Sequence, residues 1–245
     1  HIDRKTLGKA LRELIDSGKP VLTVRVDDRE DGVKLTLPAS FIQDITASVG
    51  QAVIDLRLNG SSYRLAVQVL ELAAIAERWG VTVEDLELSL VIAKASDEAV
   101  QGVERVAAGQ GAALVSDVME FKVILEADGR SMEIGEFGGA YMPRSIVTRG
   151  NSPYRTGVAY DPVTQTLSFI PSVMNARPDG TKEAMLYAPH NSLYAVVASD
   201  GRTFADIQGH WAQADIETLA SKFIIFGVAD TRFAPDNDVT RGEFT

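Results

Sequence analysis

The spacing of hydrophobic and polar residues near the start of the chain changes from helical to extended. Between residues 4 and 18, Leu7, Leu11 and Leu14 recur on one helical face with Lys and Arg opposite, and Gly18 is a suitable helix end. The next segment, "VLTVRV" at residues 21–26, alternates as a strand does. We therefore expect residues 1–19 to form a helix or linker in front of a mixed α and β module.

A strand–helix–strand order is predicted twice in the following stretch. "VKLTLPASFIQDITASVG" with "AVIDLRL" is the first copy, and "SSYRLAVQVLELAAIAERWG" with "DLELSLVIAKA" is the second. Between them stands Asn59-Gly60, a pair typical of tight hairpin turns. We predict a pseudo-duplicated β-α-β core in which helices near 39–49 and 66–79 cover the same face of one sheet.

The second half of the chain has the pattern of β-structure. Residues 96–117 are small and polar, so we expect a loop or a short helix there. From Val118 onward, strands are expected on either side of turns at "EADGR", Asp161-Pro162 and Pro189-His190-Asn191. The expected fold class is α+β: residues 20–198 form one module of repeats and antiparallel hairpins, and residues 199–245 a separate, partly helical motif.

The composition narrows the classes of partner. Of 245 residues, 34 are acidic and 24 are Lys or Arg, and the net charge of −10 repels nucleic acid phosphates and anionic lipid. No apolar run approaches the roughly 20 residues of a membrane-spanning helix. There is no cysteine, which excludes disulfides and thiolate metal sites and fits an exported surface protein. Because the chain begins at His1 without a signal peptide, we expect it to be part of a longer protein.

Catalytic motifs are absent from the sequence. None of the serine-nucleophile, zinc, P-loop or dinucleotide-binding patterns occurs. His190 lies in a predicted turn, where a polar turn residue is the simpler interpretation. We expect no metal, no cofactor and no enzymatic activity in this chain, although its many acids leave a glycosidase pair open.

Tyrosines are concentrated in the β-rich half and suggest a second kind of site. Sugars stack their apolar faces on exposed aromatic rings, and polar side chains bind the hydroxyls. Tyrosine is also common in strands for packing reasons alone, which is the competing interpretation. The candidates for sugar stacking are Tyr141, Tyr154, Tyr160, Tyr187 and Tyr194.

The most specific pattern in the chain lies between Thr203 and Phe244. It combines an opening Phe-x-Asp-Ile, a His-Trp-Ala, apolar residues at helical spacing, a segment ending in glycine, a Phe-x-Pro and a Thr-Arg-x-Glu. In this sequence these are Phe204, Asp206, Ile207, His210, Trp211, Ala212, Ile216, Leu219, Ala220, Gly227, Phe233, Pro235, Thr240, Arg241 and Glu243. Residues 203–244 thus resemble the S-layer homology motif of Gram-positive surface proteins. They depart from it at Phe223, where the family has glycine, and at Gly242, where it has alanine.

The resemblance implies attachment to the cell envelope. S-layer homology motifs usually occur in threes and bind a secondary cell-wall polysaccharide that often bears pyruvate ketals, and a ketal carboxylate suits a guanidinium. By position, Arg241 is the main expected ligand residue, supported by Thr240, Asp206 and Trp211. Because the family's grooves form between neighbouring repeats, a single motif is expected to bind only weakly. The implied location is extracellular, at the cell wall or S-layer.

The residues of the motif also lead to structural expectations. Asp206 is expected to cap the helix that Trp211 enters. Trp211, Ile216 and Leu219 are expected to form one apolar helical stripe. Gly227 is expected to stand where a side chain would obstruct a turn.

The region before the motif leaves three hypotheses for function. It resembles the segment in front of S-layer homology repeats in some very large Bacillales surface proteins. The first hypothesis is a non-catalytic anchoring fragment, and the second is a carbohydrate-binding module of a secreted polysaccharide-degrading enzyme. The third is an enzyme domain, for which convergent acids in a cleft would be required. Exposed, coplanar tyrosines would favour the second hypothesis over the first.

Overall fold

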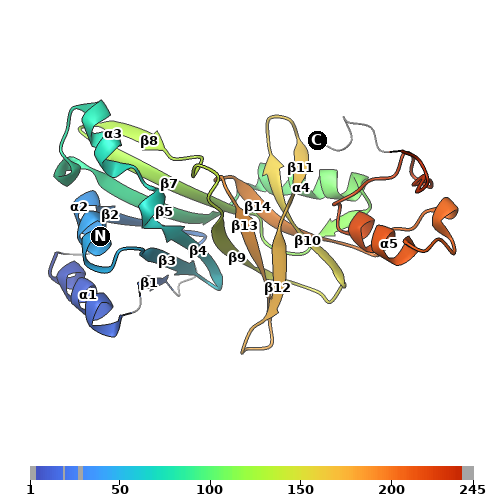
Figure 1. Cartoon of the computed structure of the whole chain (residues 1–245), viewed down its shortest axis with the longest axis horizontal. Coiled ribbons are helices and arrows are strands. Elements are labelled where there is room, and N and C mark those ends of the chain that lie inside the picture. Colours follow the sequence, from blue (N-terminus) through green and yellow to red (C-terminus); the bar gives the residue numbers. More distant parts are fainter. Residues whose placement is uncertain (1–3, 19, 27–29, 239–245) are drawn as a thin grey trace.

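Two β-sheets form the body of the protein, and five α-helices lie around them in the part of the chain that the structure describes. A computed structural model describes residues 4–18, 20–26 and 30–238. In Figure 1 the molecule is elongated, with the first helix at its left end and the last helix at its right end. The α-helices are α1 (Arg4–Ser17), α2 (Ala39–Val49), α3 (Leu72–Trp79), α4 (Asp97–Gly109) and α5 (Gln213–Ser221). Short 3-10 turns are η1 (Val67–Val69), η2 (Val83–Asp85) and η3 (Ala205–Ile207).

The two sheets have different strand content. The six-stranded sheet has the order β1 (Val21–Val26), β3 (Val53–Leu58), β4 (Ser61–Ala66), β9 (Met142–Thr148), β13 (Lys182–Ala188) and β12 (Ser172–Ala176). The eight-stranded sheet has the order β11 (Thr166–Ile170), β10 (Tyr154–Asp161), β14 (Leu193–Ser199), β7 (Met119–Ala127), β5 (Glu87–Lys94) and β2 (Gly32–Pro38). In addition, β6 (Ala112–Leu114) pairs with β14, and β8 (Arg130–Glu133) pairs with β7. The content is therefore mixed α and β, mostly strand.

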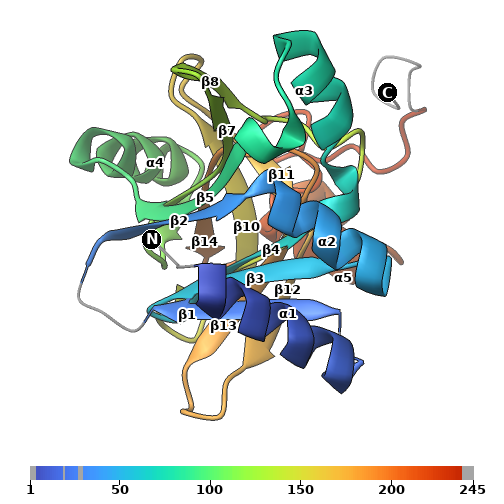
Figure 2. The same cartoon turned by 90° about the vertical axis from the view of Figure 1, so that its left-hand side faces the viewer.

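The main hydrophobic core lies between the sheets. Strand alternation places Leu56 and Tyr63 of the six-stranded sheet opposite Leu90 and Phe121 of the eight-stranded sheet, and all four are fully buried. The rings of Tyr63 and Phe121 meet edge to face with centroids 5.5 Å apart. In Figure 2 the layer with β2, β5 and β7 lies above the layer with β1, β3 and β4.

The predicted placement of two helices on one face of a single sheet is wrong. Strand β2 belongs to the eight-stranded sheet and β3 to the six-stranded one, so α2 lies in a crossover between sheets; α3 lies in the return crossover from β4 to β5. Ile42, Ile45 and Ile75 from these helices reach the core that the two sheets share. The strand–helix–strand order does occur twice, and the duplication itself stays a prediction.

The turn at residues 59 and 60 is confirmed as a hairpin. Asn59 and Gly60 have φ angles of +47° and +90°, and β3 and β4 pair in antiparallel fashion on either side of them. The turn at Pro189-His190-Asn191 is different. It joins β13 of one sheet to β14 of the other, so the expected hairpin there is wrong.

Helix α4 is longer than the loop or short helix expected for residues 96–117. Ser96 caps its first turn by accepting a hydrogen bond from the backbone N–H of Ala99. Val103 and Ala107 pack on the outer face of the eight-stranded sheet, against Val158 and Val197. This second, smaller hydrophobic core fixes α4 to the part of the eight-stranded sheet that β10 and β14 form. None of the helices in the described residues is long and apolar enough to cross a membrane.

Candidate functional site

The C-terminal segment, residues 203–238, has a small core of its own. Phe204, Ile207, Ile216 and Ala220 are buried together, and the ring of Phe233 lies 5.5 Å from that of Phe204. Helix α5 supplies two of these residues and the turn η3 one. The apolar positions of the motif thus hold the segment together, with one exception described below.

Asp206, near the start of the segment, is hydrogen-bonded to residues near its end. Its carboxylate oxygens accept hydrogen bonds from the backbone N–H groups of Phe233 (2.9 Å) and Ala234 (2.7 Å), and Arg232 lies 3.8 Å away. These backbone bonds, with the nearby guanidinium, lower the pKa of Asp206. Asp206 does not cap α5, which begins at Gln213 without a side-chain cap, so the expected capping role is wrong.

Trp211 is the largest exposed apolar side chain of the segment. It precedes α5 and is 89% exposed, and the neighbouring ring of His210 lies beside it with centroids 5.5 Å apart. The expected stripe is therefore wrong, because Ile216 is buried whereas Trp211 and Leu219 face outward. An indole that is open to solvent is available for stacking with a ligand.

The structure shows why the motif has glycine at two of its positions. A Cβ at Gly227 would overlap the ring of Phe204 and the carbonyl oxygens of Ala229 and Arg232, so the expectation that a side chain is obstructed there is confirmed. At the other position the chain has Phe223, whose φ is +58°. This is the left-handed position that follows a helix, where glycine is usual, and the carbonyl of Leu219 accepts the N–H of Ile224 in the matching pattern.

The ring of Phe223 attaches the segment to the sheets. It is buried in the same core as Val103 of α4 and Val197 of β14. Beside it, Ser199 donates a hydrogen bond to the carbonyl of Ser221 (2.9 Å). Phe223, where the family has glycine, therefore adds an apolar contact between the two parts of the chain, although its backbone is more strained than that of glycine. Thr240 and Arg241, the first two expected ligand residues, lie outside the described residues.

Two of the five candidate tyrosines cannot be sugar platforms because they are buried. Tyr160 is 3% exposed and packs under α4, where its hydroxyl lies over Gly102. Tyr194 is fully buried, and its hydroxyl donates to the carbonyl of His190 at 2.6 Å. Burial in the apolar core raises the pKa of Tyr194 to about 12.

Tyr194 belongs to a cage of aromatic rings around a buried arginine. The guanidinium of Arg144 lies 4.8, 5.7 and 5.0 Å from the ring centres of Tyr63, Phe121 and Tyr194. It donates to Asn191 Oδ1 at 2.8 Å and to the backbone carbonyls of Met142, Ala188 and His190. This arrangement is structural, because no atom of Arg144 is open to solvent.

The other candidate tyrosines keep access to solvent. Tyr141 is 57% exposed and Tyr187 38% exposed, whereas Tyr154 is half-buried against Gly201. Tyr187 is the register partner of Pro143 on β9, two residues after Tyr141, so both tyrosines belong to the region where β9 and β13 pair. Sequence reasoning missed a separate group of arginines on the outer face of the same sheet, which is described below.

Comparison with known proteins agrees with the resemblance seen in the sequence. A family model of the S-layer homology domain matches residues 203–245. The chain is 37% identical over 100 residues to an amylopullulanase of Thermoanaerobacterium thermosulfurigenes, a match that covers 40% of this chain and 5% of that protein. It is 51% identical over 45 residues to endo-1,4-beta-xylanase A of Thermoanaerobacterium saccharolyticum. It is also 51% identical over 43 residues to exoglucanase XynX of Acetivibrio thermocellus. Each of these two matches covers 18% of this chain and 4% of the relative. The matches thus span only a small part of each of these relatives.

Proposed function

We propose that this chain is a non-catalytic cell-surface module whose C-terminal motif helps to hold a large exported protein on secondary cell-wall polysaccharide. The observation that carries the proposal is the family match over residues 203–245. It is supported by the fold of the segment, in which Phe204, Asp206, Ile207 and Gly227 each have a structural role at the motif position they occupy. The location that follows is extracellular, at the cell wall or S-layer.

Polysaccharide recognition in this proposal depends on Arg241. A guanidinium can bind a ketal carboxylate through two parallel charge-assisted hydrogen bonds, and exposed Trp211 offers a ring for the sugar beside it. Asp206 accepts hydrogen bonds from two backbone N–H groups, so its contribution is to hold the segment in shape. Thr240 is proposed as a neighbouring contact.

The test is sedimentation of the protein with purified Gram-positive sacculi, before and after chemical removal of the secondary polysaccharide. We expect weak co-sedimentation with intact sacculi and none with stripped sacculi. Arg241→Ala should weaken the affinity for intact sacculi roughly tenfold, since a charge-assisted hydrogen bond contributes about 1.5–3 kcal/mol. Its melting temperature should not change. Equal binding to stripped sacculi would refute the anchoring role, and equal binding by Arg241→Ala would remove arginine from it.

A second candidate function is a carbohydrate-binding module of a polysaccharide-degrading enzyme. It is favoured by the exposure of Tyr141 and Tyr187 in one region of the six-stranded sheet. Three relatives with matching segments are named as glycan-degrading enzymes. Affinity electrophoresis in gels that contain starch, xylan or β-glucan would test this function, and Tyr187→Ala should abolish any retardation. Release of reducing ends by the pure chain would contradict the non-catalytic assignment.

A further inference from the structure

Four arginines line a groove on the outer face of the six-stranded sheet. Arg25, Arg57 and Arg64 alternate with inward core residues on β1, β3 and β4, and Arg177 follows β12. The groove has a volume of about 480 Å³, a size common for ligand sites. Its other principal lining residues are Gly60, Ser61, Ser62, Ser145, Asp179 and Glu183.

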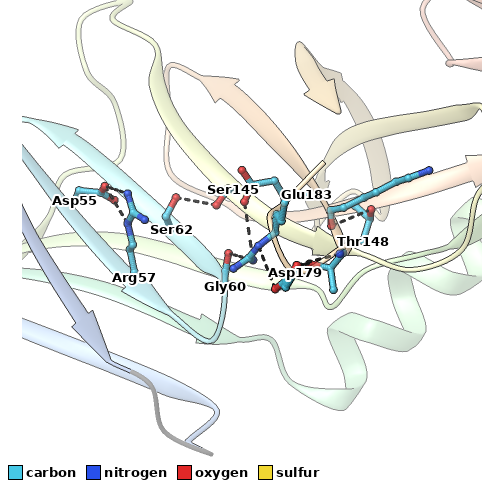
Figure 3. A network of polar contacts seen from close by, with 11 residues as sticks. Asp55, Arg57, Gly60, Ser62, Ser145, Thr148, Asp179 and Glu183 are labelled. Carbon is cyan, nitrogen blue, oxygen red and sulfur yellow. Dashed lines mark hydrogen bonds and ion pairs between the residues drawn. The ribbon is translucent and has the colours of Figure 1, made fainter. Parts of the chain in front are cut away.

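Figure 3 shows the polar contacts that shape this groove. Asp55 and Arg57 lie at one end on β3, and Ser62 and Ser145 meet in the middle across β4 and β9. At the other end, Glu183 and Asp179 lie near the turn at Gly60. The groove is therefore built from strands of both the N-terminal and the C-terminal half of the module.

Two of the arginines are held in place by the protein. Arg57 donates to Asp55 Oδ2 through Nε (3.1 Å) and Nη2 (2.7 Å), and this hydrogen bond raises the pKa of Arg57. Arg177 donates to the carbonyl of Gly60 at 3.0 Å. A Cβ at Gly60 would overlap the guanidinium of Arg177, so only glycine allows this approach. These two cations are oriented before any ligand arrives.

The other two arginines have no partner in the described part of the chain. Neither the Arg25 side chain nor the Arg64 side chain makes a hydrogen bond or ion pair there, and Nε of Arg64 is buried without a partner. Arg25 is also the register partner of Arg57 on the adjacent strand. Asp55 balances the charge of Arg57, so Arg25 and Arg64 are the two cations of the groove whose charge no described carboxylate pairs with. They also stand out in a chain whose net charge is −10.

The remaining lining residues favour a ligand that carries hydroxyl groups. Ser62 and Ser145 hydroxyls are hydrogen-bonded to each other at 2.8 Å. Asp179 and Glu183 offer carboxylates, and their distances to Arg177, 3.9 and 4.0 Å, are long for ion pairs. These two acids would repel a carboxylate placed beside them but would accept hydrogen bonds from sugar hydroxyls. Farther along β13, on the same outer side as Glu183, lies the exposed ring of Tyr187.

We propose that this groove binds an oligosaccharide that carries carboxylate groups, such as an oligomer of uronic acid. Arg25 and Arg64 bind the carboxylates. Arg57 and Arg177 keep the groove positively charged, and the serines and acids bind hydroxyls. A peptide fits less well, because β3, β4, β9 and β13 are paired on both sides and offer no free edge for strand addition. The site lies outside residues 203–245, so it is independent of the proposed wall anchor.

Titration calorimetry of the full chain with trigalacturonic acid tests this proposal. We expect binding that weakens with added salt, and none to the methyl-esterified trisaccharide, which has the same rings without the charge. The double substitution Arg25→Gln/Arg64→Gln should weaken binding at least tenfold. Its melting temperature should not fall, because neither of these side chains has a partner among the described residues. Arg105→Gln, which makes one such charge change on the exposed surface of α4, should bind as the unaltered chain does.

Each alternative result would overturn part of the proposal. Equal binding of the methyl ester would exclude carboxylate recognition, and unchanged binding by the double variant would exclude the groove. Equal binding of hexaglutamate would show a site for acidic peptides instead of saccharides. Binding of a glycerol phosphate oligomer without trigalacturonic acid would assign the arginines to phosphate. Loss of sacculus binding, by contrast, would affect only the wall anchor.

Discussion

At the scale of single residues, buried Arg144 shows how an arginine can be structural in one place and available in another. Its guanidinium is enclosed by three aromatic rings and four hydrogen-bond acceptors, and none of these acceptors is a carboxylate. Arg64 lies on the next strand of the same sheet but projects from the opposite face, where no partner meets it among the described residues. The same residue type therefore serves the core on one face and a candidate ligand site on the other.

Arg144→Lys should lower the free energy of unfolding by roughly 2–4 kcal/mol. An ammonium lacks the planar fork of the guanidinium and has three donors, so it cannot satisfy all four acceptors that Arg144 reaches. Urea denaturation followed by fluorescence measures the change. Arg105→Lys on the exposed surface of α4 is the matched control and should stay within about 0.5 kcal/mol. A loss that small at Arg144 would show that the cage tolerates any cation.

Stability should fall between pH 10 and pH 12 because of two buried tyrosines in the same cage. Burial raises the pKa of both Tyr63 and Tyr194 from 10 to about 12. In this range the unfolded chain has lost protons that the folded chain retains, so unfolding becomes more favourable as pH rises. A difference of this size corresponds to on the order of 3 kcal/mol for each ring. Urea melts at successive pH values measure it, and Tyr63→Phe should make the fall shallower. An identical fall in Tyr63→Phe would assign it to other groups.

At the scale of secondary structure, the close packing of α4 on the sheet decides the effect of a glycine. Helix propensity alone predicts that alanine in place of Gly102 stabilises α4 by up to about 1 kcal/mol. The structure predicts the opposite, because the added Cβ would overlap the hydroxyl of Tyr160. Tertiary contact thus overrides local preference at this position.

Gly102→Ala should destabilise the protein by about 1–3 kcal/mol, as overpacked core substitutions do. Gly109→Ala, in the same helix with open space around it, should be neutral or slightly stabilising. Thermal melting of the two variants gives the comparison. Tyr160→Phe in the Gly102→Ala background should recover part of the loss. If Gly102→Ala proved as stable as Gly109→Ala, Tyr160 would not be packed against the helix in solution.

At the scale of the whole molecule, Phe223 couples the C-terminal segment to the sheets. A bulky residue with φ of +58° is strained relative to glycine, whereas its ring fills a core shared with α4 and β14. The gain from burying a ring of this size, about 2–3 kcal/mol, exceeds the backbone cost of about 1–2 kcal/mol. We therefore expect the two parts of the chain to unfold together.

Phe223→Gly should separate the two unfolding transitions. The backbone of the segment keeps its left-handed turn, so the core around Phe204 and Ile216 should persist. The contact with Val103 and Val197 is lost, and the segment should become sensitive to limited proteolysis near residue 200. Differential scanning calorimetry measures the transitions. A single transition at an unchanged temperature would show that Phe223 is not the coupling contact.

Much of the local structure was determined by the sequence alone. Alternation and helical spacing predicted the segments that become β1, α2, α3 and β5, because burial on one face imposes those periods on the sequence. Asn59-Gly60 predicted a hairpin, because few residue pairs adopt positive φ twice in succession. The order of Phe204, Asp206 and Trp211 predicted the S-layer homology motif that the family match confirms.

Long-range contacts decided the rest. Periodicity shows that a strand buries one face but not which sheet it joins, so the crossovers of α2 and α3 and the change of sheet between β13 and β14 could not be predicted. Spacing likewise could not separate buried Tyr194 from exposed Tyr187, since both alternate in strands. Nor could it bring Arg25, Arg64 and Arg177 together, because these residues become neighbours only through the pairing of strands distant in the sequence. The candidate ligand groove is for this reason a property of the tertiary structure.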